Sequence, residues 1–161
     1  MLTRYKPHDI LKITKNKGAK KLPKGDNKMI KLDKSISITV PQFKNDGSAM
    51  RSEVFQRMDD ITKIFGGVTV TEAVGHWFND NGVKHIDNNL IYEWNVGNVD
   101  DVGLAVGRLI LGILSLINAG EQEAVFFKLG QTAFIYDNSV SNLASGDAER
   151  TIENYLKGAK K

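Results

Sequence analysis

The pattern of hydrophobic and polar positions predicts a series of strands and helices that starts at residue 35. The run 35–40, Ser-Ile-Ser-Ile-Thr-Val, alternates apolar and polar residues and is rich in β-branched side chains, which is typical of a strand with one buried face. Pro41 is expected to end it. From Ser48, a candidate N-cap, apolar residues recur at helical spacing as far as Phe65, and the two glycines that follow predict the end of this helix.

A β-hairpin is expected next. The segment 68–78 predicts a second strand, which Gly75 interrupts; a glycine there indicates either a bulge or a close approach of the backbone to another part of the chain. The tetrapeptide 79–82, Asn-Asp-Asn-Gly, predicts the turn of the hairpin, because its Asn-Gly step accepts the positive φ values that such turns require. The third strand is expected within 83–96, where apolar and polar residues alternate again.

The segment 102–117 is apolar nearly all round, which predicts a helix buried on more than one side, with two aspartates at its N-terminus. Three glycines interrupt it, and they indicate a close approach of the sheet or of a partner subunit: Gly103, Gly107 and Gly112. We do not expect it to span a membrane, because Arg108 interrupts it and a bilayer needs roughly 20 apolar residues. This helix is the best evidence in the sequence for a homo-oligomer.

The last part of the chain predicts a strand over 123–129, and Gly130-Gln131 either turns or bulges that strand into 132–137. After a polar loop, Asp147 is a candidate N-cap for a short C-terminal helix that ends at Tyr155 or Leu156.

The resulting order β-α-β-β-α-β predicts an α+β protein of the ferredoxin-like class, an antiparallel sheet with two helices on one face. We expect a single ferredoxin-like domain over 35–161, preceded by a basic N-terminal arm at 1–34.

Charge is distributed unevenly between these two parts. Residues 1–34 hold 11 basic and 3 acidic side chains, a net charge of +8, whereas the remaining 127 residues hold 11 basic and 16 acidic side chains, a net charge of −5. Such an arm suits nucleic acid or another polyanion, through lysines that include Lys15, Lys17, Lys20, Lys21 and Lys24. It equally suits a solvated tail, or an arm that binds the acidic body of a neighbouring protein.

Composition excludes several kinds of chemistry. The chain has no cysteine, so it forms no disulfide, no thiolate nucleophile and no thiolate metal site, and a reducing cytoplasm is the expected location. No glycine-rich phosphate loop opens a helix and no nucleophile elbow is present, so no cofactor is predicted. His76 and His85 flank the hairpin and can face each other across it, with Asp80 and Asp87 nearby, an arrangement that suits a metal or an acid–base site. A clear third ligand is missing, and no metal site is predicted.

Single residues offer further candidates for a site. Glu72 is in phase with the valines of its strand, so it either points to the apolar side as a candidate general base or marks the end of the buried region. Glu93 lies on the strand face opposite Tyr92 and Trp94, where it would meet a ligand or water. Trp77 and the aromatic pair of the third strand suit stacking on a purine ring, and packing in the core or in a subunit interface is the alternative.

Two segments resemble the bacteriophage S-adenosylmethionine (SAM) lyases and a bacterial domain family of unknown function. They are FGGVTVTEAVGHWF at 65–78, and Gln122-Glu123-Ala124-Val125 with the later landmarks Lys128, Gln131-Thr132-Ala133 and Tyr136. The resemblance covers roughly 65–137. It implies a trimer of ferredoxin-like subunits with a ligand held between subunits, and an acidic active-site residue shortly after Trp77. In this sequence Phe78-Asn79-Asp80 follows, with no glutamate, which favours ligand binding over the lyase reaction.

Three functions are therefore expected in order. The first is an oligomer, encoded by a phage or mobile element, that binds a small nucleoside-like ligand between subunits through Trp77, Glu93, Gln122 and Gln131. The second is a structural component of a larger assembly, whose basic arm docks on a partner or on nucleic acid. The third is a SAM lyase.

Overall fold

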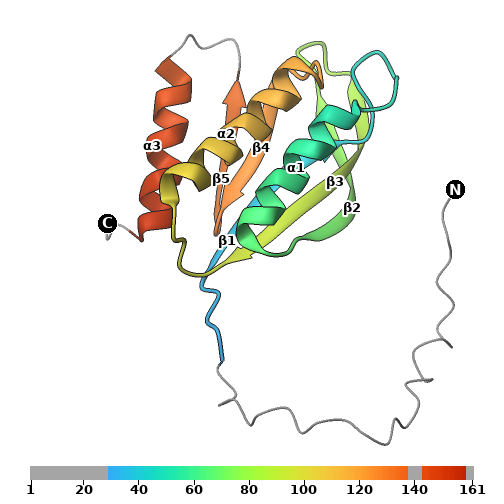
Figure 1. Ribbon diagram of the computed structural model, residues 1–161. Coiled ribbons are helices and arrows are strands. Elements are labelled where there is room, and N and C mark those ends of the chain that lie inside the picture. Colours follow the sequence, from blue (N-terminus) through green and yellow to red (C-terminus); the bar gives the residue numbers. More distant parts are fainter. Residues whose placement is uncertain (1–28, 138–142, 159–161) are drawn as a thin grey trace, which may run out of the picture. The chain divides into compact units, whose positions relative to one another are not determined.

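The computed structural model describes residues 29–137 and 143–158, and the described residues from Lys31 on belong to one compact unit. Its elements are β1 (Lys34–Pro41), α1 (Ser52–Phe65), β2 (Thr69–Phe78), β3 (Lys84–Val96), α2 (Val102–Asn118), β4 (Ala124–Leu129), β5 (Thr132–Asp137) and α3 (Leu143–Lys157), as Figure 1 shows.

The five strands form one antiparallel sheet in the order β2-β3-β1-β4-β5. Both β1 and β2 pair antiparallel with β3, so the connection from β1 through α1 to β2 crosses over the strand between them. The connection from β3 through α2 to β4 crosses over β1 in the same way. This pair of split β-α-β units confirms the predicted ferredoxin-like arrangement. Gly130 adopts φ 59° and turns the chain into β5, which adds a fifth strand at the edge.

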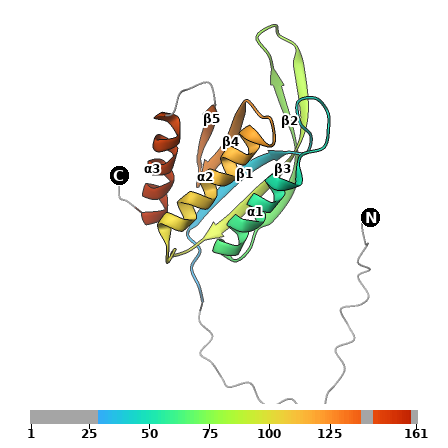
Figure 2. The ribbon, with the colours of Figure 1, turned by 45° about the horizontal axis from the view of Figure 1, so that its top comes forward.

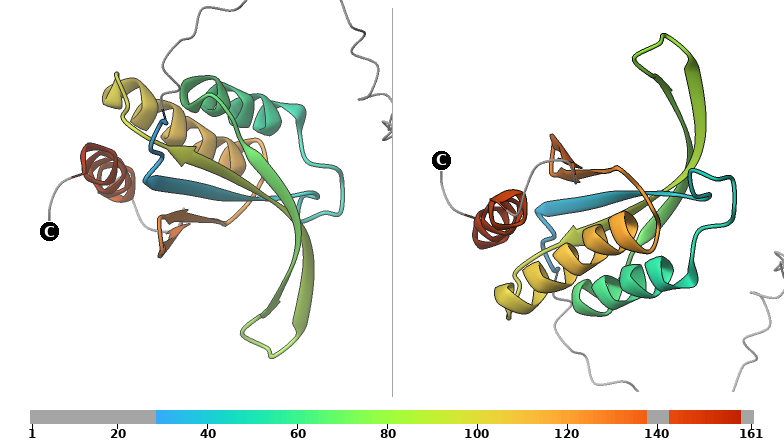
Figure 3. Two further views of the ribbon diagram at one scale, coloured as in Figure 1. Left: turned by 90° about the horizontal axis from the view of Figure 1, so that it is seen from below. Right: turned by 90° about the horizontal axis from the view of Figure 1, so that it is seen from above.

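The helices α1 and α2 lie side by side on one face of the sheet, and α3 packs against α2 beside β5 (Figure 3). We call the covered face the inner face and the opposite one the outer face. Side chains of the inner face form the core with the helices, since Ile36 and Ile38 of β1 and Trp94 of β3 are completely or almost completely buried. The indole N–H of Trp94 donates to Thr62 Oγ1 of α1 at 2.9 Å, so the largest core side chain keeps a hydrogen bond.

Helix α2 packs against the sheet, α1 and α3, which explains its apolar sequence. At Gly112 the neighbouring helix comes very close, because a Cβ atom there would lie 2.8 Å from Ile61 Cδ1. At Gly107 the space around the same helix is open. Leu104 and Leu111 remain 49% and 43% exposed, so part of the apolar surface of α2 faces solvent in the single chain.

Two predicted helix starts are wrong. Ser48 does not cap α1; its hydroxyl and backbone N–H donate to Asp46 Oδ1 in the preceding loop, and α1 begins after Arg51 without a side-chain cap. Asp147 does not cap α3, because that helix begins at Leu143 and Asp147 forms an ion pair with Arg150 one turn later. The predicted charge at the start of α2 is confirmed by Asp101, whose carboxylate accepts from Leu104 N–H at 2.9 Å.

Helix α3 is fixed to the sheet through Tyr155. Its hydroxyl donates to the carbonyl of Ser35 and accepts from the N–H of the same residue, both at 3.0 Å. Ile152 and Leu156 of α3 are buried in the core. The C-terminal helix is therefore part of the domain core.

Candidate functional site

The strands β2 and β3 extend far beyond the rest of the sheet. The last residue of β1, Pro41, lies opposite Asn89, and Ala73 lies opposite Asn89 from the other side. From Val74 to Asn88 the two strands therefore pair with each other, and the hydrogen bond from the Gln42 N–H to the Asn88 carbonyl at 2.9 Å is the last one that ties this stretch to the segment after β1. We call residues 74–88 the hairpin arm, and Figure 2 shows it projecting from the body of the domain.

Gly75 lies in the hairpin arm without a bulge, since the pairing runs unbroken through Gly75 and Asp87. A Cβ atom at this position would lie 3.0 Å from Asn89 Nδ2. Of the two predicted explanations for this glycine, the close approach is therefore correct and the bulge is wrong.

The tip of the hairpin arm is closed by hydrogen bonds from Asn79. Its N–H donates to the Val83 carbonyl at 3.1 Å, and its side-chain oxygen accepts from the N–H groups of Asn81 and Val83. Gly82 adopts φ 73°, as the sequence predicts for this glycine, whereas Asn81 does not take a positive φ. This loop determines the register of the arm and so places Trp77 opposite His85.

Trp77 lies on the outer face of the hairpin arm within a polar group that we call the arm cluster, Trp77, Asn79, His85 and Asp87. The indole and the imidazole stack with centroids 4.3 Å apart and planes 13° apart. The indole N–H donates to Asp87 Oδ2 at 2.6 Å, and Asn79 Nδ2 lies 3.3 Å from His85 Nε2. Trp77 stays 47% exposed, so a held aromatic surface faces solvent. The core position that the sequence offered as an alternative for Trp77 is wrong, because the hairpin arm projects beyond the rest of the domain and the indole is exposed.

The expectation that His76 and His85 face each other across the hairpin is wrong. His76 lies opposite Ile86 and points to the inner face, whereas His85 lies opposite Trp77 and points to the outer face. Glu72 lies on the inner face as predicted, opposite Leu90, but it is exposed because β2 is the edge strand there. It is therefore no buried general base.

Glu93 lies exposed on the outer face at the centre of the body, as predicted. It stands between Thr69 of β2 and Ser37 of β1, and Ser37 stands beside Lys128 of β4. These side chains form a polar row across the sheet. Glu93 is eight residues from His85 along β3, or roughly 26 Å, so it does not reach the arm cluster.

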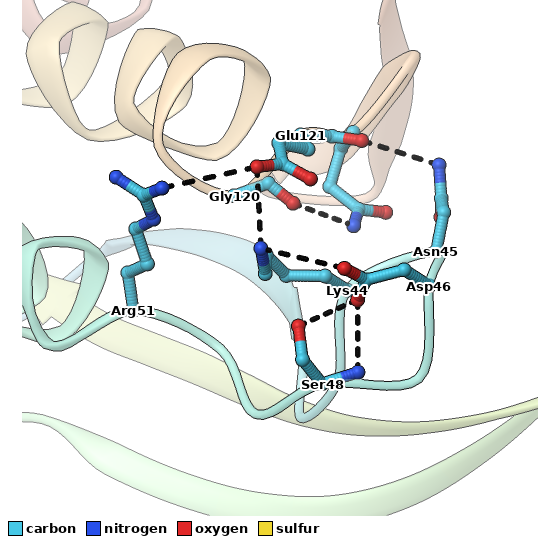
Figure 4. Close-up of polar contacts among 8 residues, drawn as sticks. Lys44, Asn45, Asp46, Ser48, Arg51, Gly120 and Glu121 are labelled. Atoms are coloured by element: carbon cyan, nitrogen blue, oxygen red, sulfur yellow. Dashed lines mark hydrogen bonds and ion pairs between the residues drawn. The ribbon is translucent and has the colours of Figure 1, made fainter.

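Gln122 lies in the loop that joins α2 to β4, where its side-chain N–H donates to the Gly120 carbonyl at 3.0 Å. The neighbouring Glu121 adopts a positive φ of 54°. Figure 4 shows how its carboxylate is held by Lys44 at 3.2 Å and by Arg51 at 3.9 Å. These contacts stabilise the strained backbone that connects α2 to β4. The hydrogen bond from Gln122 to Gly120 stabilises the same connection.

Gln131 is exposed in the turn between β4 and β5, at the end of β4 opposite to Gln122. The strand between them has six residues, which corresponds to roughly 20 Å. A single chain therefore does not bring the four predicted ligand residues together: Trp77 is on the arm, Glu93 at the centre of the outer face, and the two glutamines at opposite ends of β4.

The surroundings of two groups, Tyr92 and Asp46, explain why their pKa values are shifted. Burial beside the core raises the pKa of the Tyr92 hydroxyl, and the negative charge of Asp59 adds to this effect. The hydrogen bonds from the hydroxyl and the N–H of Ser48 lower the pKa of Asp46 below its usual value. Neither group belongs to the arm cluster.

Among the residues that the structure describes, no three histidine, aspartate or glutamate side chains lie close enough together to hold a metal ion. No helix in the same part of the chain is long and apolar enough to cross a membrane. The predicted polyanion-binding lysines at 15, 17, 20, 21 and 24 lie outside the described residues.

Sequence reasoning missed the partners of Trp77. The stacking of Trp77 on His85 and its hydrogen bond to Asp87 were not predicted, because the distance of both side chains from the indole depends on the register of the hairpin. The available signal was the spacing of Trp77 and His85 about the Asn-Gly step, which puts them on one face when the loop has an odd number of residues.

No family model and no curated protein sequence matches the chain. Among solved structures, a phage SAM lyase in complex with S-methyl-5'-thioadenosine is similar with a TM-score of 0.52 and 14% identity, over 70% of this chain and 96% of that chain. A phage SAM lyase in the apo state gives a TM-score of 0.47 and 17% identity, over 71% and 99%. The chain thus shares its fold with a phage SAM lyase, which confirms the resemblance at the level of the fold.

Proposed function

We propose that the protein is a phage-type, cytoplasmic homo-oligomer that binds a small nucleoside-like ligand between subunits. The arm cluster supplies the stacking surface, and Glu93, Gln122 and Gln131 supply polar contacts from other copies. The observation that carries the proposal is the held, half-exposed indole of Trp77 on a fold shared with a lyase solved with S-methyl-5'-thioadenosine.

The arm cluster suits an aromatic ligand for physical reasons. Asp87 and His85 hold the Trp77 ring in one orientation, so little side-chain entropy is lost when a purine stacks on it. The separation of Trp77 from Glu93 and from the glutamines means that the proposed site needs more than one subunit, because a ligand of nucleoside size does not reach the arm cluster and these residues within one chain.

Isothermal titration calorimetry of the full chain with SAM, S-methyl-5'-thioadenosine and adenosine tests the proposal. We expect binding to at least one of them, and Trp77→Ala should weaken it about 5- to 150-fold through the loss of stacking. The matched control is Phe126→Ala, an aromatic residue of similar exposure on the outer face of the body, which should bind normally. No heat from any of the three compounds contradicts the proposal.

Binding is proposed without the lyase reaction. The carboxylate that follows Trp77 most closely is Asp80, which lies exposed at the tip of the hairpin arm. Chromatography after incubation with SAM is expected to recover the intact compound. Release of methylthioadenosine would show instead that the protein is an enzyme.

A second candidate function rests on the charge difference between residues 1–34 and the rest of the chain. An arm of net charge +8 would bind nucleic acid or an acidic partner by releasing counterions, and the affinity would fall steeply with added salt. Removal of residues 1–30, which precede the compact unit, should abolish a salt-dependent gel shift while the body stays folded. An unchanged shift would exclude this function.

A further inference from the structure

The hydrogen bonds at the tip of the hairpin arm determine which way the side-chain amide of Asn79 faces. Its oxygen accepts from the N–H of Asn81 at 3.0 Å and from the N–H of Val83 at 2.9 Å. The opposite orientation would place the NH2 group of the amide against two backbone donors. The amide nitrogen is therefore the atom that faces His85, at 3.3 Å from Nε2.

This orientation determines the protonation state of His85 in the arm cluster. The amide nitrogen of Asn79 is a donor only, so Nε2 of His85 has to accept, and the proton of the neutral imidazole lies on Nδ1. An imidazolium carries hydrogen on both ring nitrogens and cannot accept from Asn79. The arm cluster, with the contacts that the structure shows, thus contains a neutral histidine.

The other two members of the arm cluster favour a charged His85 instead. The indole of Trp77 lies flat on the imidazole, with centroids 4.3 Å apart, and an aromatic face attracts a cation. Asp87 lies on the same face two residues further along β3, and its carboxylate accepts the indole N–H at 2.6 Å. A protonated His85 would therefore turn away from Asn79 and compete with the indole for Asp87.

The remaining charged or titratable side chains of the hairpin arm lie elsewhere. Lys84 and His76 belong to the inner face, because each pairs one residue out of phase with the outer positions. Asp80 is exposed in the turn at the tip. Of the described side chains on the outer face of the arm, His85 is the one of a type that changes its charge near neutral pH.

We propose that His85 is a proton switch for the arm cluster, and that its protonation weakens the binding of the nucleoside-like ligand. With a neutral His85, Asn79 connects the tip of the arm to the stacked rings, and Asp87 holds the indole. With a protonated His85, the contact to Asn79 is lost and the imidazolium competes for Asp87, so Trp77 is no longer held in one orientation. The effect on binding rests on the proposed function, whereas the change in the arm needs no ligand.

Nuclear magnetic resonance of the full chain without ligand, titrated from about pH 8 to about pH 5, tests the switch. The backbone signals of the tip and the indole signal of Trp77 should change together with the ring signals of His85. His85→Gln should abolish this common change, because glutamine can accept from Asn79 but gains no proton. The matched control is His76→Gln, a histidine of the same arm on the inner face, which should respond to pH as the parent does.

The variant Asn79→Asp should shift the response to higher pH. Its carboxylate can still accept from both N–H groups of the tip, and its second oxygen would accept from a protonated His85. The midpoint of the change should therefore rise by about one pH unit or more, because an opposite charge at this distance favours the protonated ring. A contact between Asn79 and His85 without influence on the proton would leave the midpoint where it is.

Isothermal titration calorimetry at two pH values tests the effect on binding. Whichever of SAM, S-methyl-5'-thioadenosine and adenosine binds at about pH 7.5 should bind roughly tenfold more weakly at about pH 5.5. His85→Gln should bind with the same affinity at both pH values. If SAM and adenosine both bind, SAM should lose more affinity than adenosine, because its own positive charge meets a second cation.

The outcomes separate the inference from the proposed function. A tip and an indole that do not respond to pH, a response that persists in His85→Gln, an unchanged midpoint in Asn79→Asp, or binding that is equal at both pH values overturns the inference alone. A chain that responds to pH as expected but binds none of the three compounds overturns the proposed function and the effect on binding, and supports the proton switch in the arm. Circular dichroism of each variant checks that the fold is retained.

Discussion

The close packing of α1 on α2 predicts opposite effects for the same substitution at two glycines of one helix. Gly112→Ala adds a methyl group where Ile61 Cδ1 lies 2.8 Å and Met58 Cε 3.2 Å from the new atom. Gly107→Ala adds the same methyl group five residues earlier, where nothing lies within 4 Å. Both substitutions have the same effect on helix propensity, so the difference between their free energies of unfolding reports the packing alone.

The magnitudes follow from two opposing effects. Alanine favours the helix over glycine by about 0.8–1.0 kcal/mol, and this gain should appear in full at Gly107. At Gly112 the added methyl group overpacks the core, which costs about 1–3 kcal/mol. We therefore expect Gly107→Ala to be stabilising, and Gly112→Ala to be less stable than it by about 1–3 kcal/mol.

Urea unfolding followed by tryptophan fluorescence measures this difference. The titrations should be made at two protein concentrations, because Gly107 lies on the exposed side of α2 and a change in association between copies would otherwise enter the result. Equal stabilisation by both substitutions would refute the reasoning, since it would mean that the helices leave room for a side chain at Gly112.

Other predictions concern single hydrogen bonds. Thr62→Val removes the acceptor of the buried Trp94 indole and should lower the free energy of unfolding by about 1–3 kcal/mol, whereas Thr62→Ser should retain most of it. Tyr155→Phe should cost a similar amount, about 1–3 kcal/mol, and should speed hydrogen exchange at the Ser35 amide, because one hydroxyl makes two bonds there. The pKa of Asp46 is lowered in the folded protein from its ordinary value of 3.8. Its contribution to stability is therefore complete at pH values above 3.8 and is lost as the pH falls through the lower pKa of the folded state. Asp46→Asn should remove this acid-dependent loss from the urea midpoints, and an unchanged pH profile would exclude it.

Local patterns were enough to predict most elements of the fold. Two of these predictions depend on neighbouring residues only: the alternation in 35–40, and the end of α1 at Gly66. The structure confirms both, and Gly66 adopts φ 87°. The start of α1 was wrong because Ser48 has an equally local alternative, the turn closed by Asp46. The side chain cannot make both interactions, and the sequence does not show which one is retained.

The candidate site depends on contacts between distant parts of the chain, and these were harder to predict. The hairpin arm exists because Pro41 ends β1 while β2 and β3 continue, so its length follows from comparing three strands rather than from any one of them. The exposure of Trp77 and Glu72 follows from their places on the arm and on an edge strand. Whether the four ligand candidates meet depends on a second copy, which no pattern within one chain specifies.

The central position of β1 has a consequence for how the protein is made. This strand leaves the ribosome first among the elements of the sheet, yet Ile36 pairs with Trp94 on one side and with Leu129 on the other. The β2–β3 hairpin, by contrast, consists of local contacts and forms without waiting for either end of the chain. During synthesis the hairpin is therefore present before the sheet can close around β1. A nascent chain that stops before β4 leaves one edge of β1 unpaired, which makes it a target for aggregation or for chaperones.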